Sequence, residues 1–172
     1  RFSNGAERSY ERIAGGGEDS VLVVPLLDPD TVLLVREYAA AMDRYELGLP
    51  KGRIAPGEDP LTAANREIRE EIGFAATELE LLRPLTLAPA YIDHRTQLVI
   101  ARGLVPSPLP GDEPEPPEVV PWKLSRLEEL LGRSELSEAR SIAALFIARL
   151  RSRPISADPE ADSPGLSATA PS

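Results

Sequence analysis

Short apolar runs separated by turn-forming residues are the main pattern along most of the chain. Runs this short, rich in β-branched residues, predict buried strands rather than helices. The predicted strands cover 20–27, 31–38, 45–49, 85–88, 96–104 and 119–124, the last with Trp122 half-buried. The turn signal Asp28-Pro29-Asp30 separates the first two strands, so we expect these two to pair as a hairpin.

The opening segment carries a weaker strand signal. Asn4-Gly5 is a hairpin turn sequence, and the mixed residues 7–13 after it predict a strand pair. Gly15-Gly16-Gly17 is interpreted as a plain loop, because it lacks the Lys-Ser/Thr pair of a phosphate-binding loop. Because the chain begins at Arg1 rather than at a methionine, we expect N-terminal strands of the native domain to be truncated.

Helical periodicity appears in three segments. The first covers 60–72, with Asp59 as its N-cap, Pro60 in its first turn and Gly73 where a glycine ends a helix. The other two predicted helices cover 127–131 and 137–151. The last of them places four large apolar residues on one face, which we expect to be buried: Ile142, Leu145, Phe146 and Leu150.

Strands outnumber helices, and the helices do not alternate regularly with them. This order predicts an α+β domain, a mixed β-sheet flanked by helices, rather than a doubly wound fold. The predicted domain covers 1–153, with a proline-rich acidic loop at 106–117. Residues 154–172 are rich in Ser, Ala, Pro and Asp and are expected to be disordered.

Composition narrows the class of function. A length of 172 residues fits one domain, and no apolar run is long enough to span a bilayer. The chain has no cysteine and no visible signal peptide, so we expect a cytoplasmic protein without disulfides. The net charge of −9 argues against nucleic acid as a partner. An acidic protein that binds a phosphorylated small molecule needs a bound cation and a few local arginines.

Three glutamates on the predicted helix supply a candidate cation site. Glu67, Glu70 and Glu71 are three and four residues apart, so their carboxylates share one helix face. Carboxylates this close repel one another unless a cation lies among them, and their oxygen ligands suit Mg²⁺ or Mn²⁺. Arg66 lies four residues before Glu70, where it can hold that carboxylate. Taken alone, three glutamates in this spacing are more often a solvated acidic face than a cation site.

The surrounding residues favour the cation site. The segment 52–74, GRIAPGEDPLTAANREIREEIGF, matches the Nudix signature G-x5-E-x7-R-E-U-x-E-E-x-G-U, in which U is a bulky apolar residue. All fixed positions agree: Gly52, Glu58, Arg66, Glu67, Ile68, Glu70, Glu71, Gly73 and Phe74. The chain therefore resembles the Nudix hydrolases. Segments from Arg1 to about Leu150, including LLVREYAAAMDRYELGLPKGRIAPGE and LAPAYIDHRTQLVIARGL, resemble the ADP-ribose-hydrolysing branch of that family.

The resemblance implies an α/β/α Nudix sandwich and a homodimer. It also implies Mg²⁺-dependent hydrolysis of ADP-linked compounds with release of AMP, Mn²⁺ being a substitute. The implied substrates are ADP-ribose, diadenosine polyphosphates such as the triphosphate, and NADH. Two alternatives stay open: a narrow ADP-ribose or ADP-sugar pyrophosphatase, and a Nudix domain that binds a nucleotide as a sensor without cutting it. Sensors usually have a broken signature, and this signature is intact.

The resemblance also assigns roles within the signature. Glu67 and Glu71 would bind the metal ion, with Glu70 as a third ligand or the group that orients one, and the backbone carbonyl of Lys51 would join them. Arg66 and Glu58 would hold the loop against the helix. Gly52 and Gly73 would have structural roles. The general base is expected on the loop after the signature, Glu113 first and Glu115 second.

Four further residues are candidates for substrate contact. Arg36 could meet the phosphates or the terminal ribose, and Glu46 could accept from a ribose hydroxyl; either could equally be an ion-paired strand residue. Pro89 lies where ADP-ribose pyrophosphatases carry a proline, and Tyr91 near where diadenosine-polyphosphate hydrolases carry a tyrosine. A turn proline and a packing aromatic are equally consistent with those two positions. His94, the only histidine, is interpreted as a surface residue.

Overall fold

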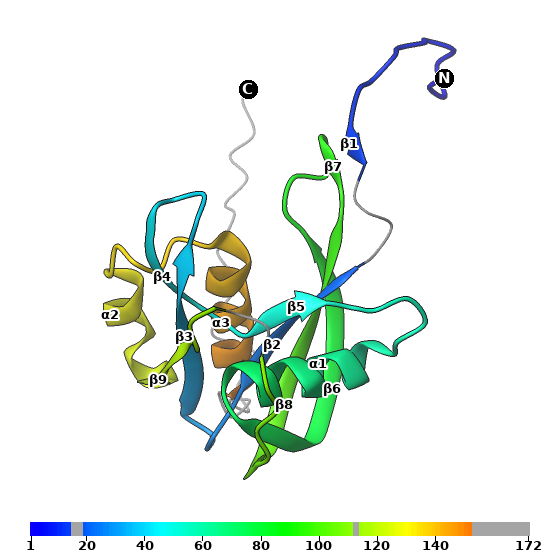
Figure 1. Ribbon diagram of the computed structural model, residues 1–172. Coiled ribbons are helices and arrows are strands. Elements are labelled where there is room, and N and C mark those ends of the chain that lie inside the picture. The colour runs from blue at the N-terminus through cyan, green and yellow to red at the C-terminus, as the bar shows by residue number, and fades with distance from the viewer. Residues whose placement is uncertain (15–18, 112–113, 153–172) are drawn as a thin grey trace, which may run out of the picture.

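The computed structural model of the protein describes residues 1–14, 19–111 and 114–152 (Figure 1). A four-stranded sheet has the order β5 (Lys51–Arg53), β2 (Ser20–Pro25), β8 (Arg95–Pro106) and β6 (Phe74–Thr86). A three-stranded sheet has the order β4 (Arg44–Gly48), β3 (Thr31–Ala39) and β9 (Glu118–Lys123). Strands β2 and β8 are parallel, and their sheet is completed by antiparallel pairs, as expected for a mixed sheet.

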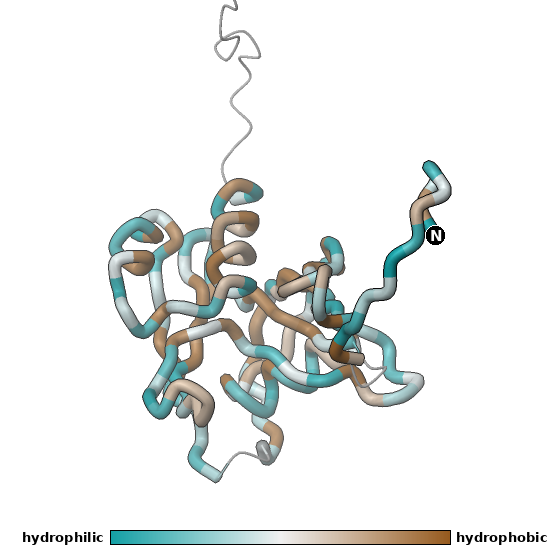
Figure 2. The backbone as a smooth tube through the Cα atoms, turned by 90° about the horizontal axis from the view of Figure 1, so that it is seen from above, coloured by the Kyte–Doolittle hydropathy of each residue, from teal (hydrophilic) through white to brown (hydrophobic). Residues whose placement is uncertain are grey.

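Alternate residues of β2 face two different apolar cores. Leu22 and Val24 belong to a core that includes residues of α3 (Ala139–Ser152), whereas Val21 and Val23 belong to a core that includes residues of α1 (Pro60–Glu71). A strand buried on both faces must be covered by a layer on each side. Figure 2 shows apolar stretches in the interior and polar ones along the outer loops. The predicted α+β class and α/β/α sandwich are confirmed.

The caps of α1 are those that the sequence predicts. The Asp59 carboxylate accepts hydrogen bonds from the backbone N–H groups of Leu61 and Thr62, at 2.9 and 3.1 Å. Pro60 occupies the first turn, where a missing N–H costs nothing. Gly73 has a φ of 76°, the left-handed conformation that a glycine adopts readily after the end of a helix. These signals fix the orientation of α1, whose buried residues include Ala64 and Ile68.

The predicted hairpin of the first two strands is wrong. β2 and β3 belong to different sheets, and an isolated bridge between Leu26 and Val32 stands in place of the expected ladder. The turn between them does form, since the Asp28 carboxylate accepts from the N–H groups of Asp30 and Thr31. β2 instead pairs with the distant strands β5 and β8. Partners this far along the chain leave no signal in local periodicity.

The start of the chain also differs from the expectation. The Asn4-Gly5 turn forms, with Phe2 N–H donating to the carbonyl of Ala6 at 2.8 Å, but no strand pair accompanies it. The first strand is the short β1 (Ile13–Ala14), which pairs in parallel with β7 (Ile92–Asp93). Figure 1 shows this segment extending away from the two larger sheets.

Two further elements differ in extent or orientation. Only 85–86 of the strand predicted at 85–88 are strand, as the end of the long β6, whose charged and exposed residues hide its alternation. In α3, the predicted face is only half correct: Leu145 is buried and Ile142 packs against the core, whereas Phe146 and Leu150 are 44% and 64% exposed. The residues that face the core are mostly small, namely Ser141, Ala144, Leu145 and Ala148. Small side chains bring the helix close to the sheet, and they give a weak apolar signal.

The remaining expectations have simple outcomes. A single turn η1 (Leu124–Arg126) leads into α2 (Leu127–Leu131), as predicted, and Trp122 on β9 is half-buried. The described part of the acidic loop has no helix or strand. The glycine triplet 15–17, Glu113 and the tail 154–172 lie outside the described residues. No helix among the described residues is long and apolar enough to cross a membrane.

Candidate active site

Arg66 organises the helix α1 and the loop before it. Its Nε and Nη2 donate to the two carboxylate oxygens of Glu58, at 3.1 and 3.2 Å, and Nη2 also reaches the carbonyl of Arg53 at 2.8 Å. Its Nη1 donates to Glu67 at 2.8 Å and to Glu70 at 3.0 Å. One planar guanidinium thus links the loop to two of the three glutamates, a geometry that lysine cannot reproduce.

Glu58 fixes the other end of this loop. Its carboxylate also accepts from the Ala55 N–H at 2.9 Å. The hydrogen bonds from Arg66 hold the pKa of Glu58 below its usual range. Gly57 next to it has a φ of 79°, which a residue with a side chain rarely adopts. Both predicted bracing residues, Arg66 and Glu58, therefore lie in one charged network.

Glu67 lies against a glycine for a steric reason. Its side chain is only 10% exposed, and a Cβ on Gly52 would overlap its carboxylate. The absence of a side chain at Gly52 therefore creates the space that the carboxylate occupies. This is a structural requirement for the first glycine of the signature, independent of any flexibility of the chain.

Glu71 is a buried carboxyl group with a strongly raised pKa. Burial raises its pKa to about 8, against the lowering effects of the Lys51 charge and backbone N–H. Its Oε1 accepts from that N–H at 3.3 Å, and its Oε2 is buried without a hydrogen-bond partner within the described part of the chain. The Lys51 ammonium forms an ion pair with Glu37. A buried carboxylate oxygen without a donor suits a cation as its missing partner.

A cavity of about 680 Å³ opens beside these carboxylates. One wall is formed by β5 and α1, with Glu67, Glu70 and Glu71. The facing wall is part of the acidic loop, with Pro110, Gly111, Pro116 and Pro117. Lys51, Arg53 and Arg66 also line this cavity and place positive charge beside an anionic ligand, with Lys51 and Arg66 already ion-paired to glutamates.

The three carboxylates fit a hard divalent cation by their donor atoms. In the ranges 1–14, 19–111 and 114–152, however, no three acidic or histidine side chains already converge on one point. Arg66 holds Glu67 and Glu70, and Glu71 is directed to Lys51. A cation would therefore compete with Arg66 for two of its ligands.

Arg36 and Glu46 lie outside this cavity. Arg36 is ion-paired with Glu118 and Glu135, at 3.2 and 2.7 Å, and lines a neighbouring cavity. Glu46 accepts from Ser137 at 2.8 Å and from Arg44, and it lines a third, smaller cavity.

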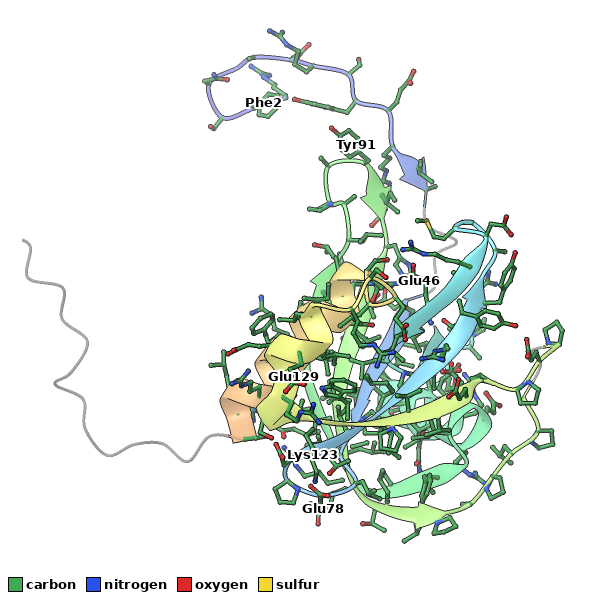
Figure 3. All side chains as sticks on the ribbon, turned by 90° about the vertical axis from the view of Figure 1, so that its left-hand side faces the viewer. Phe2, Glu46, Glu78, Tyr91, Lys123 and Glu129 are labelled. Carbon is green, nitrogen blue, oxygen red and sulfur yellow. The ribbon has the colours of Figure 1, made fainter. Side chains whose placement is uncertain are left out.

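Pro89 and Tyr91 lie farther away. Both are exposed in the connection between β6 and β7, and Tyr91 lies near the N-terminal arm (Figure 3). His94 is half-buried, with its Nε2 at 3.1 Å from the Ser20 hydroxyl. Within its own chain, neither Pro89 nor Tyr91 lines the cavity beside the carboxylates.

The structure adds residues that the sequence did not single out. The ammonium of Lys51 and the carboxylate of Glu37 lie next to Glu71, and two tyrosines, Tyr38 and Tyr45, line the neighbouring cavity. Tyr45 donates from its hydroxyl to Glu115 at 2.7 Å, so Glu115 is engaged at the rim. The sequence offered one indication of Glu37 and Tyr38. Both follow Arg36 directly on the same predicted strand, where neighbouring residues face opposite sides of the sheet.

The helix, the loop and the carboxylates together define a Nudix hydrolase. The model of the NUDIX domain matches residues 18–150, and the chain belongs to that family. Over 148 residues it is 45% identical to the ADP compounds hydrolase NudE of Escherichia coli (strain K12), covering 86% of this chain and 79% of that protein.

Two further comparisons agree. A crystal structure of an ADP compounds hydrolase matches with a TM-score of 0.80 and 45% identity, covering 87% of this chain and 80% of that one. The ADP-ribose pyrophosphatase of Bacillus subtilis (strain 168) is 25% identical, over 86% of this chain and 80% of that protein. The predicted membership of the Nudix family is confirmed. Nudix hydrolases generally use divalent metal ions.

Proposed function

We propose that the protein hydrolyses the diphosphate bond of ADP-linked compounds and releases AMP. The proposed substrates are ADP-ribose, diadenosine polyphosphates such as the triphosphate, and NADH. The observation that carries the proposal is the intact arrangement of Arg66 and three glutamates on one wall of a cavity. The relative at 45% identity, named an ADP compounds hydrolase, supports the substrate class.

We propose the following roles for the residues of this site. Glu67, Glu70 and Glu71, with the carbonyl of Lys51, would hold Mg²⁺, or Mn²⁺ in its place. The bound ion supplies charge neutralisation for the diphosphate and a lower pKa for the attacking water. Lys51 and Arg53 lie where they can attract the phosphates, and Arg66 with Glu58 keeps the helix and loop in place.

The proton acceptor is proposed on the acidic loop. Water attacks one phosphorus, the bond from that phosphorus to the bridging oxygen breaks, and the base takes the water proton. Described parts of the loop face the carboxylates across the cavity. Glu115 accepts a hydrogen bond from Tyr45, so Glu113, which lies outside the described residues, is the first choice. Glu113→Gln should then lower kcat more than Glu115→Gln does.

Arg36 and Glu46 are proposed contacts for the substrate half beyond the diphosphate. Both lie in cavities near the carboxylates, but each is already paired. Substrate would therefore replace an internal partner of either residue. Arg36→Lys and Glu46→Gln should raise KM and leave kcat nearly unchanged.

A homodimer is part of the proposal. The arm 1–14 and the connection 87–91 expose several large apolar side chains: Phe2, Tyr10, Ile13, Leu87 and Tyr91. Figure 3 shows Phe2 and Tyr91 at the same end of the molecule, away from Glu129 and Lys123. A second copy would cover this surface. Only through such a dimer could Pro89 and Tyr91 contact a substrate. Light scattering should give twice the mass of the chain, and deletion of 1–12 should halve it.

The experiment for the activity is a product assay with several substrates. Purified protein with Mg²⁺ is given ADP-ribose, diadenosine triphosphate, NADH and ADP-glucose, and AMP is quantified by chromatography. AMP from the first three supports the proposal. AMP from ADP-ribose or ADP-glucose alone indicates a narrow pyrophosphatase, which the Bacillus subtilis relative favours by its name. Nucleotide binding without AMP would indicate a sensor.

A further inference from the structure

A second cavity adjoins the cavity beside the carboxylates. Its volume is about 720 Å³, and the two share Pro116 and Pro117 as lining residues. It is bounded by the β3–β4 hairpin on one side and by the end of the acidic loop on the other. A ligand whose diphosphate lies beside Glu67, Glu70 and Glu71 can therefore extend past the two prolines into this space.

Two aromatic rings line this second cavity. Tyr38 and Tyr45 are directly paired across β3 and β4, with ring centroids 5.6 Å apart at 70°. Both rings are about half exposed, at 52% and 49%, although aromatic rings are normally buried when the fold allows it. Their hydroxyl groups donate to Asp43 and to Glu115, which fixes the rings in place. Exposed and fixed aromatic rings are suited to stacking on a planar group.

The charges of this cavity exclude a phosphate as its occupant. Its lining includes three carboxylates, Glu37, Glu115 and Glu118, but only one cationic side chain, Arg36. Arg36 is already ion-paired, as is Glu37. Carboxylates repel phosphate but accept hydrogen bonds from ribose hydroxyls and exocyclic amino groups. The chemistry of the wall thus fits an uncharged group with a planar ring and several donors.

We propose that this second cavity binds a nucleoside half of the substrate, with Tyr38 and Tyr45 as the stacking platform for its base. The proposal rests on the proposed function for the identity of the substrate, but nucleoside binding itself can be measured without turnover. A substrate would then lie across Pro116 and Pro117, with its diphosphate beside the carboxylates and its base against the tyrosines.

The test compares two double variants. Tyr38→Leu with Tyr45→Leu removes both rings, and Tyr38→Phe with Tyr45→Phe keeps the rings but removes the hydroxyls. For diadenosine triphosphate, the leucine pair should raise KM by about tenfold or more with kcat within about twofold, as expected for loss of base stacking. The phenylalanine pair should keep KM within about threefold of the unaltered protein. Phe146→Leu on α3 is a control for loss of an exposed ring outside both cavities.

Binding of adenosine alone provides the independent readout. Adenosine carries no phosphate, so saturation-transfer NMR with EDTA present reports the base site without the metal ion. Adenosine signals should appear with the unaltered protein and the phenylalanine pair and disappear with the leucine pair. If the protein hydrolyses no ADP compound, this result still decides the inference. Unchanged KM and unchanged adenosine signals in a folded leucine pair would overturn it while leaving the proposed hydrolysis intact.

Discussion

The two walls of the cavity beside the carboxylates are built in different ways. The wall with the glutamates comes from one continuous segment, 52–73, in which a single arginine links the loop and the helix. The facing wall comes from the acidic loop, whose Glu115 accepts a hydrogen bond from Tyr45 of the β3–β4 hairpin, 70 residues earlier in the chain. The first wall therefore depends on residues within one segment, whereas the second depends on segments that meet only in the folded chain.

The largest expected effect is loss of turnover from the glutamate wall. Glu71→Gln should fold normally and lower kcat for every substrate by about a thousandfold. The proposed metal site would lose a ligand, and the diphosphate would lose the charge neutralisation that the ion supplies. Glu78→Gln, on the exposed part of β6, is the matched control and should leave kcat unchanged. Initial rates of AMP release check this prediction, and near-normal turnover of Glu71→Gln would refute the role of Glu71.

A substitution at Gly52 should separate position from charge. Gly52→Ala places a Cβ where the Glu67 carboxylate lies, so Glu67 must turn away although no charge is lost. We expect kcat to fall by about a hundredfold, as for misplaced catalytic groups, with little change in the free energy of unfolding. A variant as active as the unaltered protein would mean that the position of Glu67 is unimportant.

Glu71 and Gly52 both lie in the segment whose local structure could be predicted from the sequence. The helix, its caps and the Arg66–Glu70 contact were predictable because each depends on residues within one helical segment. The pairing of β2 with β8 and the position of Tyr38 opposite Tyr45 were not, because their partners lie far along the chain or across a turn. The face of α3 was mistaken because Ser141, which accepts from the Leu49 N–H at 3.2 Å, carries no apolar signal yet is fully buried.

A smaller effect is expected when the brace is altered. Arg66→Lys keeps the charge but cannot bridge Glu58, Glu67 and Glu70 together, so kcat should fall by about tenfold and the free energy of unfolding by about 1–2 kcal/mol. Arg69→Lys is the matched control on the same helix, since Arg69 donates to the carbonyl of Ser107 rather than to a glutamate. Equal effects of the two substitutions, in urea unfolding and in turnover, would argue against a special role of Arg66.

The last expected effect is on stability as a function of pH, with no loss of a catalytic group. The folded-state pKa of Glu71, about 8, is above its ordinary value of 4.5, so the folded protein holds that proton more tightly than the unfolded chain. Stability from this group is complete below about pH 4.5 and is lost as pH rises toward 8. With EDTA present, the loss between pH 5.5 and 8.5 should be on the order of 1–3 kcal/mol.

Urea unfolding at the two pH values measures this loss. In Glu71→Gln, which has no carboxyl group at this position, the contribution should vanish. The difference between the two proteins isolates Glu71 from other titrating groups. An identical pH dependence in both proteins would show that burial does not raise this pKa.

The contrast between the walls is tested most directly by whether each substitution changes kcat or KM. Separate values of kcat and KM for ADP-ribose and for diadenosine triphosphate are measured for the unaltered protein, for Glu70→Gln and for the Tyr38→Leu, Tyr45→Leu pair. The account predicts that Glu70→Gln lowers kcat for both substrates alike and keeps their ratio, whereas the tyrosine pair acts through KM and leaves kcat intact. A fall in kcat for the tyrosine pair as large as that for Glu70→Gln would contradict the division of chemistry and binding between the two walls.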